Sequence, residues 1–223
     1  MNDIKNIQKY FAEHNYVVIK GFLDKNLANL FYNYCITKVK SVDFKYQYSK
    51  DSYDTDWDGN WKDVQALGAY SNYGDVLMET LLLLSTNTIE SYTGLTLIPN
   101  YSYWRLYQLG NVLEKHTDRP SCEISLTLCL GYNISNTEEN YNWPMYVLDP
   151  VLKEPVPAYM EPGDMIIYRG CEVEHWREEF KGLNLAQVFL HYNDSSKENY
   201  IQFDGRPILA VPKMYQTSVG GNE

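Results

Sequence analysis

Residues 107–118 read YQLGNVLEKHTD, and the end of this stretch places an imidazole, His116, two positions before a carboxylate, Asp118. In an extended strand, side chains at positions i and i+2 project from the same face, so both groups can reach one metal ion. A third ligand from a distant strand would complete a set of two histidines and one carboxylate. That set leaves three positions open on an octahedral iron and is typical of sites that activate oxygen.

His175 is the best candidate for the third ligand. It follows the segment 161–170, EPGDMIIYRG, in which a Pro-Gly-Asp turn leads into an apolar strand. The other two histidines of the chain are His14, which borders the first expected helix, and His191, which alternates along a late strand and is interpreted as structural. An HxD triplet alone often arises by chance, so its surroundings on both sides matter.

Three segments in this order resemble 2-oxoglutarate/iron(II) oxygenases of the prolyl-hydroxylase-like and phytanoyl-CoA-hydroxylase-like kind. They are the Y-x-x-G-x-x-L-x-x-H-x-D pattern of 107–118, the strand-like CEISLTL of 122–128, and the turn and strand of 161–170. The resemblance covers residues 101–192. It implies an α+β fold with a double-stranded β-helix core, which is jelly-roll or cupin-like, and with supporting N-terminal helices.

The resemblance also implies an activity. By it, His116, Asp118 and His175 hold Fe(II), while 2-oxoglutarate and O2 are the cosubstrates. Such an enzyme hydroxylates its substrate, or carries out a related oxidation, and releases succinate and CO2. Relatives that halogenate usually have a small residue at the carboxylate position, so Asp118 favours hydroxylation. No catalytic residue is assigned beyond the metal ligands, and the substrate stays open because this fold serves many.

The distal carboxylate of 2-oxoglutarate needs a cation, and here the chain departs from the usual family pattern. Many relatives carry Arg or Lys nine or ten residues after the distal histidine, where this chain has Asn184 and Leu185. Arg177 is the first substitute, because it lies on the same expected strand face as the distal histidine and could make a bidentate contact. Arg105 is the second. Hydroxyl groups that could add hydrogen bonds, or could equally be interior packing residues, are those of Tyr107, Ser125 and Thr127.

Three further cations are less favoured as the anchor. They lie in or beside apparent turns, where the simplest interpretation is a surface ion pair. These residues are Lys181, Arg119 and Arg169.

In the second half of the chain, short β-type segments alternate with turns, as in an all-antiparallel β structure. Short β-type segments separated by turns are expected over 101–109, 123–130, 144–148, 157–160, 165–169, 172–176 and 186–192. Six or more such strands favour a sandwich or barrel. We expect one domain over 1–223, with a helical support region at 1–95, the β core at 96–203 and a C-terminal extension at 204–223.

The first half is expected to be mostly helical. A first helix carries Ile4, Ile7 and Phe11 at helical spacing, and 16–19 resembles a short strand. Asp24 and Asp75 are expected to cap two further helices, the second of which stops at Gly94. The stretch 41–64 loses periodicity and is rich in Asp, Tyr and Trp, so it is interpreted as an active-site lid or a solvated loop.

Composition excludes some partners. The net charge of −10 argues against nucleic acid and anionic membrane surfaces, because both select for basic proteins. No apolar run approaches a membrane span, and the polar start has no signal-peptide character. Four cysteines without a pairing pattern indicate reduced thiols, so we expect a cytoplasmic protein. The expected substrate is a small molecule or a polypeptide. The oligomeric state stays open.

Two other functions compete with the oxygenase. A cupin-like metal enzyme that does not use 2-oxoglutarate would keep the three ligands, and the missing downstream cation favours it. A non-catalytic jelly-roll module would bind sugars or peptides through the chain's many tyrosines and its 5 tryptophans, with incidental histidines. Convergence of the three ligands, and a cation a cosubstrate's length from them, would separate these alternatives.

Overall fold

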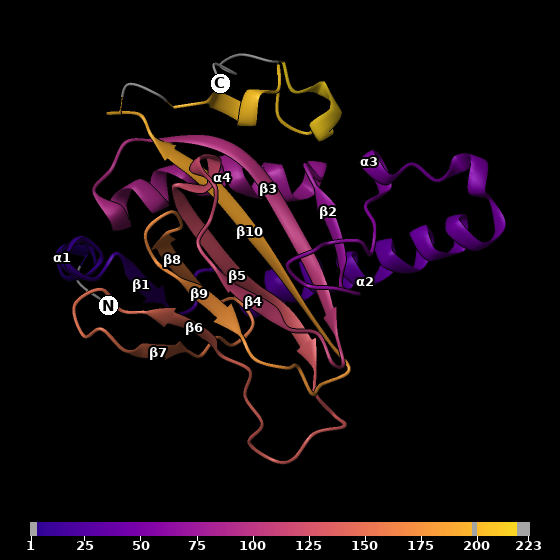
Figure 1. The fold of residues 1–223 in the computed structure, drawn as a ribbon, viewed down its shortest axis with the longest axis horizontal. Coiled ribbons are helices and arrows are strands. Elements are labelled where there is room, and N and C mark those ends of the chain that lie inside the picture. The colour runs from indigo at the N-terminus through magenta and orange to yellow at the C-terminus, as the bar shows by residue number, and fades with distance from the viewer. Residues whose placement is uncertain (1–3, 198–199, 218–223) are drawn as a thin grey trace.

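The computed structural model describes residues 4–197 and 200–217, which form two facing antiparallel β-sheets with helices on one side (Figure 1). The large sheet has the order β1 (Tyr16–Ile19), β8 (Met165–Arg169), β5 (Ile124–Asn133), β10 (Asn184–Asp194), β3 (Leu97–Gln108) and β2 (Tyr70–Tyr73). The small sheet has the order β4 (Leu113–His116), β9 (His175–Arg177), β6 (Met145–Leu148) and β7 (Pro155–Ala158). From β3 to β10 the chain passes repeatedly between the sheets, as in a jelly roll, which confirms the predicted fold class.

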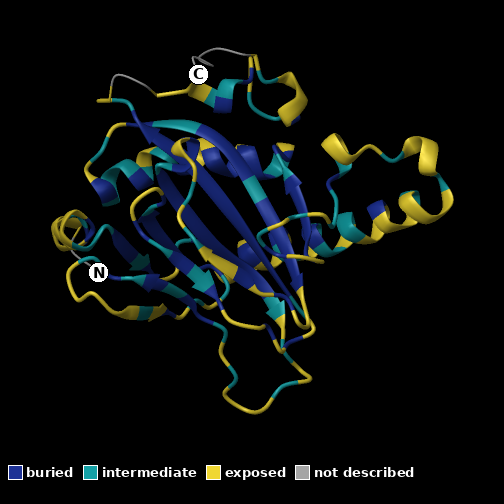
Figure 2. Cartoon of the chain, viewed as in Figure 1, coloured by how far each residue is buried: buried dark blue, intermediate teal, exposed yellow. Residues whose placement is uncertain are grey.

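Alternation along the central strands gives the large sheet two different faces. On β5, Leu126 and Leu128 pack into the core beneath the helices, whereas Ser125 and Thr127 point into the space between the sheets. β10 follows the same rule, and both strands are buried along most of their length (Figure 2). Buried polar side chains need partners, so a polar interior face is where a functional site is expected.

Helices cover the outer face of the large sheet, where the main hydrophobic core lies. They are α1 (Ile4–His14), α2 (Lys25–Tyr48) and α4 (Val76–Thr93). The expected caps are present: the carboxylates of Asp24 and Asp75 each accept hydrogen bonds from two main-chain N–H groups of the first turn. Gly94 ends α4 in the left-handed conformation, with φ of 73°.

The interpretation of 41–64 as a loop was wrong at its start, because α2 continues to Tyr48. Val42 is the last buried residue of this helix, and beyond it Phe44 and Tyr48 are exposed and contact each other one turn apart. Because this end of the helix has no buried face, its sequence lacks the apolar periodicity by which helices are predicted. This end projects from the sheets, and α3 (Thr55–Asp58) follows it (Figure 1).

Other boundaries also need correction. The strand expected over 172–176 is limited to β9, and the one expected over 157–160 lies two residues earlier as β7. β2 and β4 were not predicted, and β1 and β2 extend the large sheet from within the region expected to be helical support. Within the described residues, no helix is long and apolar enough to cross a membrane.

The segment that follows β10 is held down on the sheets. Arg206 forms a buried ion pair with Glu79 of α4, with 2.7 Å between Nη2 and Oε1. Arg119 donates to both carboxylate oxygens of Asp204, at 2.8 and 2.6 Å. Removing one partner of a buried pair typically costs several kcal/mol, so this segment is a fixed part of the described structure.

Candidate metal centre

Three side chains meet where β4 and β9 adjoin. β4 ends at His116, which is opposite His175, the first residue of β9. Oδ1 of Asp118 lies 3.6 Å from Nε2 of His116 and 3.7 Å from Nε2 of His175. These distances are too long for good hydrogen bonds, but they approach the spacing of about 3–3.6 Å between two atoms that each lie about 2 Å from one ion. The structure therefore brings together the three predicted ligands.

Main-chain carbonyl groups fix both imidazole rings. Nδ1 of His116 donates to the carbonyl oxygen of Glu114 at 2.6 Å, and Nδ1 of His175 donates to that of Val173 at 3.0 Å. Since a carbonyl can only accept, each ring carries its proton on Nδ1 and presents the Nε2 lone pair to the centre. Metal-binding histidines are commonly oriented in this way. Burial also lowers the pKa of His175, which keeps that ring neutral near neutral pH.

Asp118 lies just beyond the end of β4. The prediction that both His116 and Asp118 belong to one strand therefore holds for His116 only. Its main-chain N–H donates to the carbonyl of Gly170 at 2.8 Å, and its Oδ2 accepts from the Ser125 hydroxyl at 2.8 Å. Burial raises the pKa of Asp118, but the nearby histidines and this hydroxyl outweigh burial, and the pKa is about 2. Asp118 is thus ionised, with Oδ1 facing the imidazoles.

Gly170 makes room for the carboxylate ligand. A Cβ atom there would overlap Oδ2 of Asp118 and the carbonyl oxygen of Cys122, and would lie 2.8 Å from Oγ of Ser125. We expect Gly170→Ala to displace Asp118, to weaken metal binding about 10-fold or more, and to destabilise the fold by about 1–3 kcal/mol. Metal titration and thermal unfolding measure both effects, with the exposed neighbour Cys171→Ala as control. Unchanged metal affinity in Gly170→Ala would contradict this role.

A cavity of 540 Å³ opens onto the three ligands. Aromatic rings form much of its wall, namely those of Tyr73, Tyr101, Tyr103, Tyr168 and Phe189. The charged side chains that line it, apart from the ligands, are Asp63, Arg105, Arg119 and Lys213. Its size lies within the range of small-molecule sites.

His191 has a position that sequence reasoning underestimated. It lines this cavity, and its Nδ1 lies 2.9 Å from Oγ of Ser125, the hydroxyl that holds Asp118. Burial lowers the pKa of His191 to about 4, so the ring is neutral. His191 lies two positions after Phe189 on β10, so both side chains project from the same face of the strand, which is the inner one.

Arg177, the first anchor candidate, is buried between the sheets. Its Nη1 donates to the carbonyl of Trp143 at 2.6 Å, and its Nη2 donates to Oε1 of Gln187 at 2.9 Å. Burial lowers the pKa of Arg177, and no carboxylate pairs with it among the described residues. Among the described residues, Nε of Arg177 and Nε2 of Gln187 are buried donors without a hydrogen-bond partner. A bound carboxylate would satisfy both, so the donor set fits the distal end of 2-oxoglutarate.

Arg105 is placed differently. It lines the cavity, but its Nε donates to Asp63 at 2.6 Å and its Nη2 to Oε1 of Gln65 at 2.7 Å. Its charge is therefore already balanced. The hydroxyl of Tyr107 lies 3.3 Å from Nη1 of Arg105, and that of Thr127 lies 3.4 Å from the hydroxyl of Tyr168.

The remaining predicted cations lie elsewhere. Arg169 packs over the ring of Phe11 on the helical side, and Lys181 lies in an exposed loop. Arg119, which was less favoured because it adjoins a turn, lines the cavity. Gln187, Asp63 and Lys213 were not predicted individually. Alternation on the last strand could have found Gln187, and Asp63 lies in the stretch 41–64 that was interpreted as a possible active-site lid, whereas nothing in the sequence marks Lys213.

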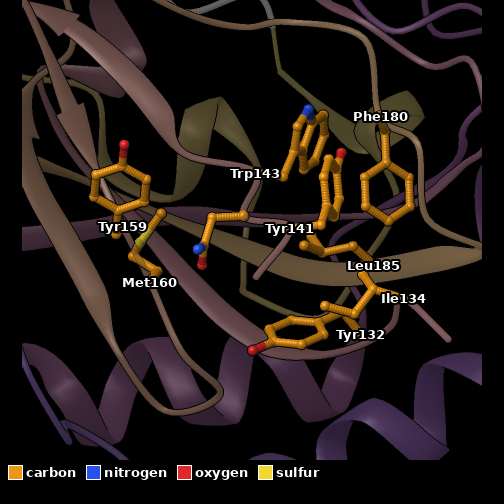
Figure 3. A pocket seen from close by; sticks show the side chains of 9 residues that line it. Tyr132, Ile134, Tyr141, Trp143, Tyr159, Met160, Phe180 and Leu185 are labelled. Carbon is orange, nitrogen blue, oxygen red and sulfur yellow. The ribbon is translucent and has the colours of Figure 1, made fainter. Parts of the chain in front are cut away.

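Aromatic side chains line a small pocket beside Arg177, and Figure 3 shows Tyr141, Trp143 and Phe180 grouped on one side of it. Trp143 lies beneath the guanidinium group at 4.4 Å and packs against Phe180, with ring centroids 4.7 Å apart. Together with Tyr141 and Leu185 they leave a cavity of only 20 Å³. The larger cavity of 540 Å³, by contrast, is the one that the three predicted ligands line.

No family model and no curated protein matches the chain. A Pseudomonas putida prolyl-4-hydroxylase structure matches with a TM-score of 0.60 and 14% identity, over 86% of this chain and 100% of that one. SnoK, a non-heme alpha-ketoglutarate-dependent carbocyclase from nogalamycin biosynthesis, gives 0.64 and 13%, over 87% and 85%. The epimerase SnoN, in complex with Fe3+, alpha-ketoglutarate and nogalamycin RO, gives 0.61 and 10%, over 86% and 84%. At these identities the likeness concerns the fold, and the chain has the fold of 2-oxoglutarate/iron(II) oxygenases.

Proposed function

We propose that the chain is an Fe(II)/2-oxoglutarate-dependent oxygenase that hydroxylates its substrate and releases succinate and CO2. The observation that carries the proposal is the convergence of two Nε2 lone pairs and one carboxylate oxygen at the floor of an open cavity. Such a set leaves positions free for a bidentate cosubstrate and O2. A structural metal site would instead be closed by four protein ligands.

The orphaned donors of Arg177 and Gln187 support 2-oxoglutarate as the cosubstrate. Many relatives carry the anchoring cation nine or ten residues after the distal histidine, where this chain has Asn184 and Leu185. In this proposal Arg177 of β9 supplies the cation and contacts Gln187 of β10. An anchor at Arg177 would account for the missing downstream cation, which is the best support for a cupin-like enzyme.

When bound, Fe(II) with its cosubstrates supplies the oxidising chemistry. The protein's share is positioning. Ser125 occupies Oδ2 of Asp118, which leaves Oδ1 as the ligand atom, and the two carbonyl contacts hold the imidazoles. Arg177 would orient 2-oxoglutarate along the interior, and the aromatic cluster around Trp143 excludes water from its distal end.

The test is to add Fe(II) and 2-oxoglutarate to the protein without oxygen and to look for the weak visible charge-transfer band of the chelate. We expect the band to saturate at one equivalent of iron. Iron binding without the band would favour the cupin-like alternative. Failure to bind iron would leave a non-catalytic binding module as the better description.

A further inference from the structure

We propose that the substrate is a small molecule with an anionic group, which Lys213 binds at the mouth of the metal cavity, and with a flat apolar body that packs on the tyrosine wall. This inference rests on the proposed function, since it takes the 540 Å³ cavity as the substrate site. It concerns the part of that cavity that is lined by Lys213, a residue of the segment 200–217 that follows β10.

The charges of the cavity are committed to partners with one exception. Asp118 is a metal ligand, and Asp63 is held by Arg105 and by the hydroxyl of Tyr103 at 2.8 Å. Arg119 is paired with Asp204. In the part of the chain that the structure describes, Lys213 has no ion pair or hydrogen bond through its side chain, although it lines the cavity. An ammonium group left free at a cavity mouth is available to an incoming anion.

Lys213 is positioned rather than free to swing away with its segment. It begins the short 3-10 helix of 213–215, and Gln216 of the same segment donates to Asp204 at 2.9 Å. Asp204 in turn accepts from Arg119 and from the hydroxyl of Tyr73 at 2.7 Å. The backbone that carries Lys213 is therefore fixed to the cavity wall by charged and neutral hydrogen bonds.

The wall beside Lys213 suits a flat apolar group. Tyr73 and Tyr101 stack with ring centroids 4.8 Å apart, and the guanidinium of Arg119 lies 4.7 Å from the ring centre of Tyr101. Tyr101 also lies against His191, with centroids 4.5 Å apart. The guanidinium of Arg206 lies 4.8 Å from the ring centre of Tyr73, so ring faces are partly covered and the rings offer mainly their edges to the cavity that they line. A planar substrate body could pack edge-to-face against them.

The positive charge at this mouth contrasts with the protein as a whole. With a net charge of −10, the chain would repel anions from most of its surface. Arg119 and Lys213 both line the cavity that leads to the proposed metal centre, and because Asp204 balances Arg119, the local excess of positive charge comes from Lys213. A local cation in an acidic protein is expected to guide and hold anions at that place.

The experiment compares three probes that share a naphthalene ring and differ in charge. They are the anion naphthalene-2-sulfonate, the neutral 2-naphthalenemethanol and the cation naphthalen-2-ylmethylammonium. Each is titrated calorimetrically, without oxygen, into the protein loaded with Fe(II) and 2-oxoglutarate. Sulfonate is a poor iron ligand, and the bound cosubstrate occupies the Arg177 site, so neither should capture the probe. We expect the sulfonate to bind about 10-fold more tightly than the alcohol, and the ammonium most weakly.

Variants assign the preference to one side chain. Lys213→Gln should remove the preference for sulfonate, and Lys213→Glu should reverse it towards the ammonium. Lys25→Glu, which changes the net charge equally at an exposed position outside the cavity, should keep the wild-type order. Equal binding of the three probes, or a preference that survives Lys213→Glu, would overturn the inference. Failure to form the iron–cosubstrate chelate before any probe is added would instead count against the proposed function.

Discussion

Replacing His175 with alanine is expected to lower Fe(II) affinity by more than about 100-fold and to abolish oxidation of 2-oxoglutarate. His175 is 2% exposed and supplies one of the three ligand atoms of the proposed centre. Asp118 also lies near Cys122 and His191, but Tyr101 contacts the thiol and Ser125 contacts the imidazole, so we expect neither to replace the missing Nε2. Loss of one ligand also leaves His116 and Asp118 as an incomplete pair that water must complete. Anaerobic Fe(II) titration measures the affinity, and succinate release measures turnover.

A matched control is His14→Ala. His14 pairs with Asp149 at 2.8 Å and does not line the metal cavity, so this variant should bind Fe(II) like the wild type even if it is less stable. Thermal unfolding of both metal-free variants separates loss of a ligand from loss of the fold. Wild-type iron affinity in a folded His175→Ala protein would refute the proposed centre.

The convergence of the three predicted ligands could be anticipated for two reasons. His116 and Asp118 are only two residues apart, and His175 follows the Pro-Gly-Asp turn of a segment that resembles the oxygenase family. What the sequence does not show is that β4 stops between the first two, so that Gly170 and Ser125 hold the carboxylate instead of a strand. Such contacts join segments that are far apart in the chain, so no periodic pattern in the sequence predicts them.

The same distinction applies to the fold. Strands with one face in the core and helices with a buried stripe were predictable, and so were the caps Asp24 and Asp75, because each is visible within a few residues. The projecting end of α2 was not, since its aromatic residues face solvent. Lys213 lies on the cavity only because ion pairs of Asp204 and Arg206 fold the C-terminal segment back. No local sequence pattern predicts that this segment folds back onto the cavity.

Arg177→Met is expected to weaken 2-oxoglutarate binding by about 2–5 kcal/mol, which is roughly 30- to 5,000-fold. A buried guanidinium that has only the neutral acceptors Trp143 and Gln187 has lost its hydration without gaining an opposite charge. A cosubstrate carboxylate would supply that charge together with the partners that Nε of Arg177 and Nε2 of Gln187 lack. Titration of the charge-transfer band with 2-oxoglutarate at saturating Fe(II) measures the change.

Arg105→Met is the informative comparison, because Arg105 is the other predicted anchor. It should leave Asp63 buried without its cation and destabilise the fold by about 3–5 kcal/mol, while cosubstrate affinity in the folded protein changes little. The two variants therefore predict opposite patterns: loss of cosubstrate affinity in Arg177→Met, and loss of stability in Arg105→Met. If affinity falls only in Arg105→Met, the anchor is Arg105, and 2-oxoglutarate must displace Asp63 to reach it. Unchanged affinity in both variants would refute both arginines as the anchor of 2-oxoglutarate.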